Sequence, residues 1–461
     1  MVMTLRRRVL GPALAGALLL AGCGTLPTFV PDLERRPAAP VRLEGAQGPL
    51  STAQSQAIIA KLRSQRGQDT DIFDRHLALE EAIVGSPLTV GNRVRLLQDG
   101  PATYEAMFAA IAAARDHINM ETYILEDDEV GQRFAQALIA RQQQGVQVNL
   151  IRDSVGTIGT PAAFFQRLTD AGVQVLEFNP VNPLAVRKDW AVNQRDHRKL
   201  LIVDGRTAFL GGINISSVYS GGSRQRADTD SALVWRDTHL QLQGPVVADL
   251  QQLFLATWGQ QKGPPLVPRH YFPPPENVGR EVVRAIGSSP EEPYSQIYKT
   301  LLSAIASAES SVLLTNAYFV PDPQLLAALE AAAARGVDVR LILPSETDSW
   351  LVFHAGRAYY ARLLRAGVKI HERRGAILHA KTGLIDGVWA TVGSTNLDWR
   401  SFLHNHELNA VVLGAEFGRE LRAMFDKDLA ASDEVTLEQW ERRPLNLRLK
   451  ELFGRAWEYW L

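Results

Sequence analysis

The stretch DHRKLLIVDG, residues 196–205, sets a histidine and a lysine one residue apart in front of an apolar run that ends at Asp-Gly. The same motif recurs as LHAKTGLIDG at residues 378–387, so His197 and His379 lie 182 residues apart in the sequence. Each apolar run is typical of a buried strand, and Asp-Gly is typical of a tight hairpin turn. Since side chains two positions apart on a strand share a face, each histidine points to the same side as its lysine.

Small residues face each motif across the expected hairpin. With a two-residue turn, Gly211 and Gly212 lie opposite Arg198 and His197. The second copy repeats this arrangement, with Gly393 opposite Ala380 and Ser394 opposite His379. Backbone that carries little side chain leaves room for a ligand to approach.

Other blocks recur in the same order, which indicates an internal duplication. ALIARQQQGVQVNLI at 137–151 matches ALEAAAARGVDVRLI at 328–342, and FFQRLTDAGVQVLE at 164–177 matches YYARLLRAGVKIHE at 359–372. In each block a helical run closes at glycine and a strand follows. We therefore predict an α/β fold of two tandem α/β/α domains with mixed, largely parallel sheets.

The chain has 461 residues, enough for two or three domains, and a formal net charge of −1. No global positive field is present to hold a polyanion, so nucleic acid is disfavoured as a partner. Composition predicts domains at 91–265 and 294–461, joined by a Pro-rich linker at 266–293. Residues 24–90 are expected to form a tether with a short helical segment.

The N-terminus combines three arginines, a short apolar stretch and the residues Leu-Ala-Gly-Cys, which predicts an export signal at 1–23. This end resembles a bacterial lipobox, and Cys23 is the only cysteine in the chain. The resemblance implies a lipid-anchored protein outside the cytoplasm, with the outer membrane as one destination. An ordinary signal peptide or an uncleaved anchor is the alternative.

Each motif offers a histidine, a fixed cation and a following amide beside bare backbone. Two such units around one phosphorus supply a nucleophile and a general acid, together with positive charge over the non-bridging oxygens. That set suits phosphodiester exchange at one active site shared between the domains. No Cys/His/Asp cluster has metal-ligand spacing, so neither a metal nor another cofactor is expected.

His-x-Lys-x4-Asp followed by Gly-Gly/Ser-x-Asn, present twice, resembles the phospholipase D superfamily from about residue 91 onward. The resemblance implies that His197 is the nucleophile and that His379 protonates the leaving group. It implies phosphate-holding roles for four further residues: Lys199, Lys381, Asn214 and Asn396. Asp204 and Asp386 complete the motifs and are grouped with the catalytic residues, although their place at the turn favours a structural role.

The superfamily also uses a carboxylate downstream of each motif to orient the histidine ring. By this resemblance Glu407 serves the second motif, while Asp230 serves the first because it precedes an apolar strand. Asp228 is the rival in the first half, where five extra residues separate Asn214 from this position.

Four stretches look like the cardiolipin synthase branch: 119–125, 235–247, 316–329 and 392–408. That branch passes a phosphatidyl group through the enzyme to the glycerol hydroxyl of phosphatidylglycerol, with phosphatidylethanolamine as another candidate lipid. A phospholipase D-type hydrolase that gives phosphatidic acid is the alternative. A nuclease and a non-catalytic lipid-binding lipoprotein rank lower, and the oligomeric state is left open. Aromatic residues at the C-terminus, Trp457, Tyr459 and Trp460, suit either core packing or membrane contact.

Overall fold

The computed structural model describes residue 29 and residues 41–64, 71–73, 76–181, 193–221, 234–292 and 295–461. The expected export signal, Cys23, Asp228 and Asp230 lie outside the described residues.

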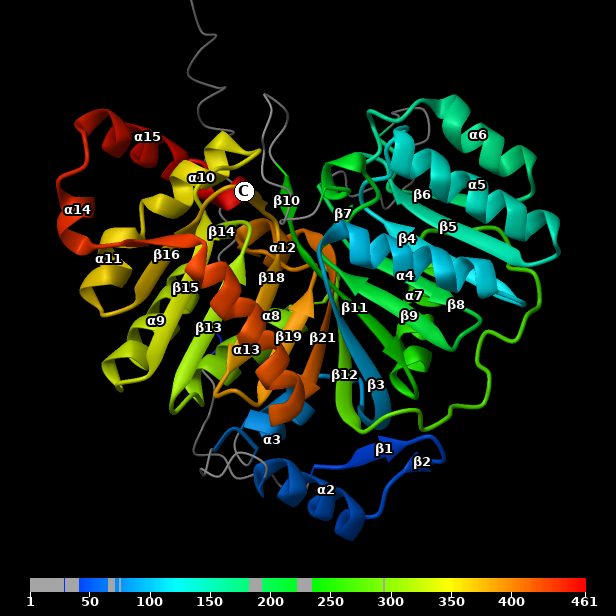
Figure 1. Cartoon of the computed structure of the whole chain (residues 1–461), viewed down its shortest axis with the longest axis horizontal. Helices are drawn as coiled ribbons and strands as arrows, with labels where there is room; N and C mark the ends of the chain where they lie inside the picture. Colours follow the sequence, from blue (N-terminus) through cyan, green and yellow to red (C-terminus); the bar gives the residue numbers. More distant parts are fainter. Residues whose placement is uncertain are drawn as a thin grey trace, which may run out of the picture.

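The strands of both halves join in one continuous mixed sheet (Figure 1). The first half runs from the outer edge to the centre as β6 (Gln174–Phe178), β5 (Gln147–Asp153), β4 (His117–Thr122), β8 (Lys199–Val203), β9 (Thr207–Gly211), β11 (Thr238–Gln243) and β3 (Leu88–Gln98). The second half continues outward as β12 (Glu281–Ser288), β21 (Asn405–Leu413), β19 (Trp389–Gly393), β18 (Lys381–Ile385), β13 (Ser311–Asn316), β15 (Asp338–Pro344), β16 (Lys369–Arg373) and β22 (Ser432–Val435). The second half repeats the first, with β3 and β12 antiparallel at the seam. The duplicated α/β fold is confirmed.

Within the strand order given above, the parallel pairs are β4–β5 and β5–β6 in the first half, and β13–β15 and β15–β16 in the second. Towards the centre the neighbours run antiparallel, because each histidine motif opens a hairpin whose return strand pairs with a further antiparallel strand. The sheet is mixed as expected, with less parallel pairing than the alternation of helices and strands suggested.

Helices cover both faces of the sheet. On β8, Leu200 and Ile202 pack with α7 (Val246–Gln260) and α13 (Ala415–Ala430), whereas Leu201 and Val203 pack with α4 (Asp99–Ala113), α5 (Glu129–Gln143) and α6 (Ala162–Asp170). The alternation follows from the two-residue period of a strand. In the second half the corresponding layer is α8 (Gln296–Ala306), α9 (Pro323–Ala334) and α11 (Tyr360–Arg365).

The short helical segment expected here is present at residues 52–64, but a tether is wrong for residues 41–64, 71–73 and 76–84, which pack on the rest of the protein. They form β1 (Leu43–Gly45), β2 (Gly48–Pro49), α2 (Thr52–Ser64), a short 3-10 turn (Asp71–Phe73) and α3 (His76–Ile83). Leu43, Phe73 and Leu77 are buried in the same core as α8 and α9, and β1 extends β3. Burial of these apolar side chains fastens the segment to the second half.

The expected linker is also wrong in part, because residues 281–288 form β12. This strand pairs with β21 on one side and with β3 on the other, so it joins the two halves of the sheet. All but two of its residues are buried, which the neighbouring prolines obscured in the sequence.

The hairpins are one residue longer than expected. Val203 pairs with Thr207 and Ile385 pairs with Trp389, so each turn contains three residues. Asp204 and Asp386 adopt left-handed backbone angles, with φ of 53° and 52°. The longer turn moves the small residues by one position and brings Gly211 and Gly393 towards the lysines.

The turn carboxylates bind backbone. Asp204 accepts hydrogen bonds from the amides of Arg115, Asp116 and His117, at 2.8–3.2 Å. Asp386 accepts the equivalent amides of residues 309–311. Both aspartates lie at the far end of β8 or β18 from the lysine, about 15 Å along the strand. Grouping them with the catalytic residues is therefore wrong; they tie each hairpin to the strand beside it.

Within the described residues, no helix combines the length and the apolar character needed to cross a bilayer.

Candidate active site

Two short parallel strand pairs cross between the halves and carry the histidines. β7 (Arg195–Asp196) pairs with the start of β21, and β10 (Trp235–Arg236) pairs with β17 (Ile377–Leu378). The pairing continues into the motifs, since the His197 amide donates to the His406 carbonyl at 3.0 Å and the His379 amide donates to the Arg236 carbonyl at 2.8 Å. Each histidine is thus fixed to the backbone of the opposite half.

The residue after each backbone acceptor is a carboxylate that binds the histidine ring. His197 Nδ1 lies 3.0 Å from Glu407 Oε1 and 3.1 Å from Oε2, and His379 Nδ1 lies 2.7 Å from Asp237 Oδ2. The expected pairing within each half is wrong, because Glu407 serves the first motif and a carboxylate of the first half serves the second. Asp237 takes the place that was expected for Asp230.

A signal for Asp237 was present in the sequence. Gly244 and Gly414 each lie between a helix and the preceding strand, and both have positive φ. Asp237 directly precedes its strand, and Glu407 lies in its strand. Counting seven residues back from Gly414 reaches Glu407, and counting seven back from Gly244 reaches Asp237. Counting forward from Asn214 fails because the first half contains a longer insertion there.

The carboxylates set the tautomer of both rings. A carboxylate accepts, so Nδ1 carries the proton and Nε2 keeps its lone pair in the neutral ring. Burial lowers the pKa of His197 to about 4, and the charges of Lys199 and Lys381 add to this against the effect of Glu407. Burial and the charge of Lys381 also lower the pKa of His379. Both rings are neutral near pH 7 before an anion binds.

Glu407 is fully buried and is held by further hydrogen bonds from Ser394 Oγ and Asn405 Nδ2. Burial favours protonation, but the charge and hydrogen bond of His197 and the charge of Lys199 outweigh it, so the pKa of Glu407 is lowered overall. The ionised carboxylate therefore remains available to hold the ring of His197.

The two motif lysines are buried, with 3% and 2% of their surface exposed. Lys199 Nζ donates to the His197 carbonyl and lies 5.2 Å from the ring centre of Tyr123, and Lys381 Nζ donates to the His379 carbonyl. Burial lowers the pKa of Lys199 to about 7 and that of Lys381 to about 8, and the charge of Lys381 further lowers the pKa of Lys199. Two buried cations that repel each other form a site for an anion.

Aromatic rings surround the histidines. Tyr123 packs edge-on against His197 at 5.0 Å between ring centres, while Trp235 and Tyr318 lie 5.1 and 6.3 Å from His379. These rings remove water from the histidines, which accounts for their burial. All three rings lie in stretches that the sequence analysis picked out by resemblance, 119–125, 235–247 and 316–329, but it gave none of the three a role of its own.

The two asparagines differ in their surroundings. Asn214 Nδ2 donates to the Tyr219 hydroxyl at 3.2 Å, and that hydroxyl lies 3.3 Å from His379 Nδ1. Asn214 is thus linked to the histidine of the other half. Asn396 is 3% exposed, and its side-chain oxygen has no hydrogen-bond partner among the described residues.

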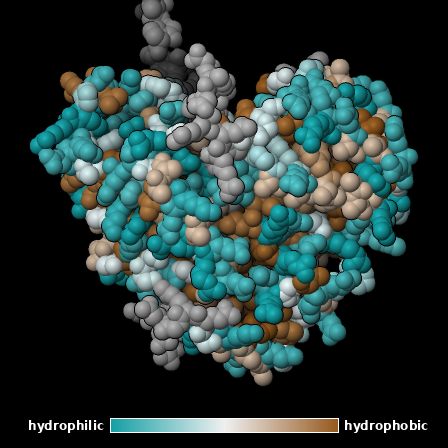
Figure 2. Space-filling view, in the orientation of Figure 1, coloured by the Kyte–Doolittle hydropathy of each residue, from teal (hydrophilic) through white to brown (hydrophobic). Residues whose placement is uncertain are grey.

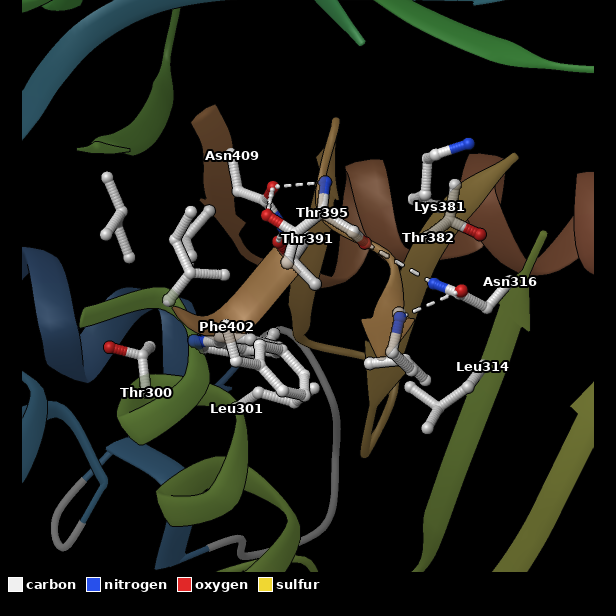
Figure 3. A pocket seen from close by; sticks show the side chains of 16 residues that line it. Thr300, Leu301, Leu314, Asn316, Lys381, Thr382, Thr391, Thr395, Phe402 and Asn409 are labelled. Carbon is white, nitrogen blue, oxygen red and sulfur yellow. Dashed lines mark hydrogen bonds between the residues drawn. The ribbon is translucent and has the colours of Figure 1, made fainter. Parts of the chain in front are cut away.

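A polar network holds the segment that carries Asn396, next to a small cavity behind Lys381 (Figure 3). Thr395 Oγ1 donates to Asn409 Oδ1 at 2.8 Å, Asn409 Nδ2 donates to Thr391 Oγ1, and the Leu397 amide donates to Asn316 Oδ1. The cavity has a volume of about 30 Å³, which is room for about one water molecule. The cavity is too small for a lipid, and the polar network beside it holds the wall of the site in place.

The small residues of the hairpins, which were expected to leave room for a ligand, also leave room for neighbouring side chains of the site. A Cβ on Gly212 would lie 2.2 Å from Asp237 Oδ1, and a Cβ on Gly393 would lie 2.1 Å from Asn409 Oδ1. Glycine at these positions makes room for the groups that orient the site, in addition to any ligand.

The structure therefore brings together most of the expected site around the crossing strand pairs: His197, Lys199, His379, Lys381, Asn214, Asn396 and Glu407. Within the described part of the chain, no three His, Cys, Asp or Glu side chains are grouped so as to hold a metal ion.

The chain is similar to proteins of one family. Residues 107–258 and 301–429 match the family model described as cardiolipin synthase, PLD-like domain, and each range contains one histidine motif. Cardiolipin synthase of Geobacillus sp. (strain WCH70) is 36% identical over 382 residues, which cover 82% of this chain and 74% of that protein. Cardiolipin synthase A of Pseudomonas aeruginosa (strain LESB58) is 38% identical over 373 residues, covering 80% and 73%.

A solved structure shares the fold at low identity. Phosphatidylserine synthase of Haemophilus influenzae Rd KW20 superposes with a TM-score of 0.57 at 13% identity, over 80% of this chain and 95% of that one.

Proposed function

Because this chain belongs to the cardiolipin synthase family of phospholipase D-like phosphatidyltransferases, we propose that it makes cardiolipin through a phosphatidyl-histidine intermediate. The observation that carries the proposal is the crossed arrangement, in which each histidine ring is fixed by a carboxylate of the opposite half. Two rings with free Nε2 atoms then serve one phosphorus between two buried lysines.

In the first step His197 Nε2 attacks the phosphorus of a phospholipid. The N–P bond forms as the bond to the headgroup oxygen breaks, and the leaving oxygen takes a proton from His379 Nε2. With phosphatidylglycerol as donor, the released alcohol is glycerol. Glu407 stabilises the positive charge that develops on the ring of His197.

In the second step the glycerol hydroxyl of another phosphatidylglycerol gives its proton to His379 and attacks the phosphorus. The N–P bond breaks, which returns His197 to its neutral form and releases cardiolipin. Water in place of this hydroxyl gives phosphatidic acid, so the outcome depends on which acceptor reaches the intermediate.

The bound phosphodiester prepares the site for this chemistry. An anion beside Lys199, Lys381 and His379 favours their charged forms and raises their pKa values from the lowered values of the empty site. With the bound anion beside it, His379 takes up from solvent the proton that it later donates, and the two lysines carry the positive charge over the non-bridging oxygens.

The test uses the purified full chain with labelled phosphatidylglycerol, alone and with phosphatidylethanolamine. We expect labelled cardiolipin by mass spectrometry, in equal amount with released glycerol when phosphatidylglycerol is the only lipid. His197→Ala should abolish it with the fold kept, as judged by circular dichroism. Phosphatidic acid as the main product would instead establish the hydrolase, and no product from either lipid would refute the proposal.

We also propose that the protein is anchored outside the cytoplasm through acylated Cys23. The lipobox-like residues that precede this single cysteine support the proposal. Mass spectrometry of the mature N-terminus should find a diacylglyceryl group on Cys23. An unmodified cysteine, or a chain that keeps residues 1–22, would contradict it.

A further inference from the structure

The large apolar side chains that face solvent are concentrated in a few segments. Eleven are exposed among the residues that the structure describes, and nine of them lie on three loops or helix starts and at the C-terminus. We call these nine the apolar rim: Ile158, Val218, Trp350, Leu445, Leu449, Leu452, Phe453, Trp457 and Trp460. The other two, Val267 and Phe272, lie between α7 and β12.

In both halves the rim lies at the end of the sheet that carries the site. Thr122 at the carboxyl end of β4 pairs with Lys199, and β5 runs parallel to β4, so the loop with Ile158 follows β5 at this end. In the second half Asn316 pairs with Lys381, and α10 (Trp350–Arg357) follows β15 at the matching end.

Contacts and neighbouring residues in the sequence link the rim to His379. The ring of Tyr318 lies 6.3 Å from that of His379, and its hydroxyl donates to Asp348 at 2.7 Å, two residues before Trp350. Trp350 in turn lies 6.2 Å from Phe453. On the other side Val218 precedes Tyr219, whose hydroxyl contacts His379.

The C-terminal helix is turned outward. On α15 (Leu445–Arg455) the buried positions are Glu451 and Gly454, which pack against Arg443 and α10. Leucines at 445, 449 and 452, together with Phe453, are 56–70% exposed on the opposite side. A helix that buries a carboxylate and a glycine and exposes three of its four leucines is built to meet an apolar phase. Figure 2 shows brown residues at the upper left, where Figure 1 places α15.

Basic side chains flank this apolar face. Arg448, Lys450 and Arg455 are exposed on α15. A groove of about 460 Å³ beside the helix is lined by Arg448, Arg455 and two further arginines, which pair with Glu441 and Glu451. Long basic side chains beside an apolar stripe suit the anionic headgroups at the surface of a bilayer.

We propose that the apolar rim is the surface by which the protein docks on a phospholipid bilayer that contains anionic lipid, with the end of the sheet that carries the histidines towards the headgroups. The inference rests on the proposed function for the nature of the substrate. Docking lets a phospholipid reach the histidines without leaving the membrane, and it explains why both halves expose apolar side chains at this end of the sheet.

The test is vesicle flotation of the full chain in a Cys23→Ser background, which removes any acyl anchor. The rim variant Leu449→Ser/Leu452→Ser/Phe453→Ser is compared with Val267→Ser/Phe272→Ser, which changes exposed apolar residues elsewhere. On vesicles of phosphatidylglycerol and phosphatidylethanolamine we expect the rim variant to lose at least about tenfold in the bound-to-free ratio, and the control to bind as the parent does. Turnover of water-soluble dihexanoyl phosphatidylglycerol should be unchanged in both.

Equal flotation of the rim variant and the parent would overturn the proposal, as would a parent that does not float. A dimer that the rim variant dissociates, with flotation unchanged, would identify a second copy as the occupant and also overturn it. Loss of flotation in the rim variant while the parent fails to turn over the soluble lipid would refute the proposed function and leave the docking surface standing.

Discussion

The ring of His197, in the first half of the chain, is held by Glu407, in the second half, with Nδ1 3.0 Å from Oε1. His379 and Asp237 form the reciprocal pair at 2.7 Å. Neither half alone contains a histidine with its orienting carboxylate, so the duplication is functional only as a pair.

The crossed carboxylates predict a loss of activity when either is neutralised. Glu407→Gln keeps an amide oxygen that can accept from Nδ1–H of His197, but it removes the negative charge and introduces an NH2 donor. The ring can then adopt the other tautomer, and the charge that develops on it is unsupported. We expect transfer to fall by about 10²–10⁴-fold in kcat. Glu416→Gln, at an exposed carboxylate, is the control. Full activity of Glu407→Gln would show that the contact has no role in the reaction.

Gly212 is predicted to be essential for the second pair. In Gly212→Ala the new Cβ would lie 2.2 Å from Asp237 Oδ1, so the carboxylate must leave His379. We expect kcat to fall at least about 10²-fold. Gly259→Ala, in α7 with nothing within 4 Å of its Cβ, should keep activity. If Gly212→Ala remains as active as this control, the contact between Asp237 and His379 is dispensable.

The buried lysines are predicted to reduce stability in the empty enzyme. The pKa of Lys199 is lowered by burial to about 7, from 10.5. Below pH 7 the folded state carries the buried charge, and between pH 7 and 10.5 it holds fewer protons than the unfolded state, so stability rises with pH across this window. Lys199→Met should be inactive because it lacks the cation of the site. Its free energy of unfolding should exceed that of the parent most strongly below pH 7, where the parent carries the buried charge.

The difference in unfolding free energy between Lys199→Met and the parent should decrease by at most about 1.4 kcal/mol per pH unit between pH 7 and 10. Urea unfolding at several pH values measures it, with the exposed Lys61→Met as control. A difference between Lys199→Met and the parent that does not change with pH would contradict the assignment of a buried, charged lysine.

Asp386 is predicted to act on stability and not on chemistry. Burial opposes its ionisation, but amide hydrogen bonds from residues 309–311 outweigh this and lower its pKa. Asp386→Ala should lose about 2–3 kcal/mol of unfolding free energy. The part of this due to ionisation is present in the parent above pH 4 and is lost as the pH falls below it. Folded Asp386→Ala should keep kcat within a few fold; a loss as large as that of Glu407→Gln would return Asp386 to the catalytic group.

The duplicated fold and the positions of the histidines and lysines could be predicted because they rest on local pattern. Spacing within a strand and the recurrence of helix–glycine–strand blocks are visible in sequence. The crossing of the carboxylates could not be predicted, since it depends on β7 and β17 pairing with strands of the opposite half. The three-residue turn could not be predicted because hydrogen bonds from three amides far away in the sequence stabilise Asp204 in its left-handed backbone conformation. The described residues between 41 and 84 were misread as a tether because many of them pack on partners far away in the sequence, as His76 does on Ser303.

The most direct test of the central claim is a burst experiment with phosphatidyl-p-nitrophenol, whose leaving group needs no acid. In His379→Gln we expect release of about one nitrophenol per protein without further turnover, and peptide mass spectrometry should find the phosphatidyl group on His197. His197→Gln should give no burst. A burst from His197→Gln, or cardiolipin synthesis with no adduct on His197 in any variant, would contradict the account.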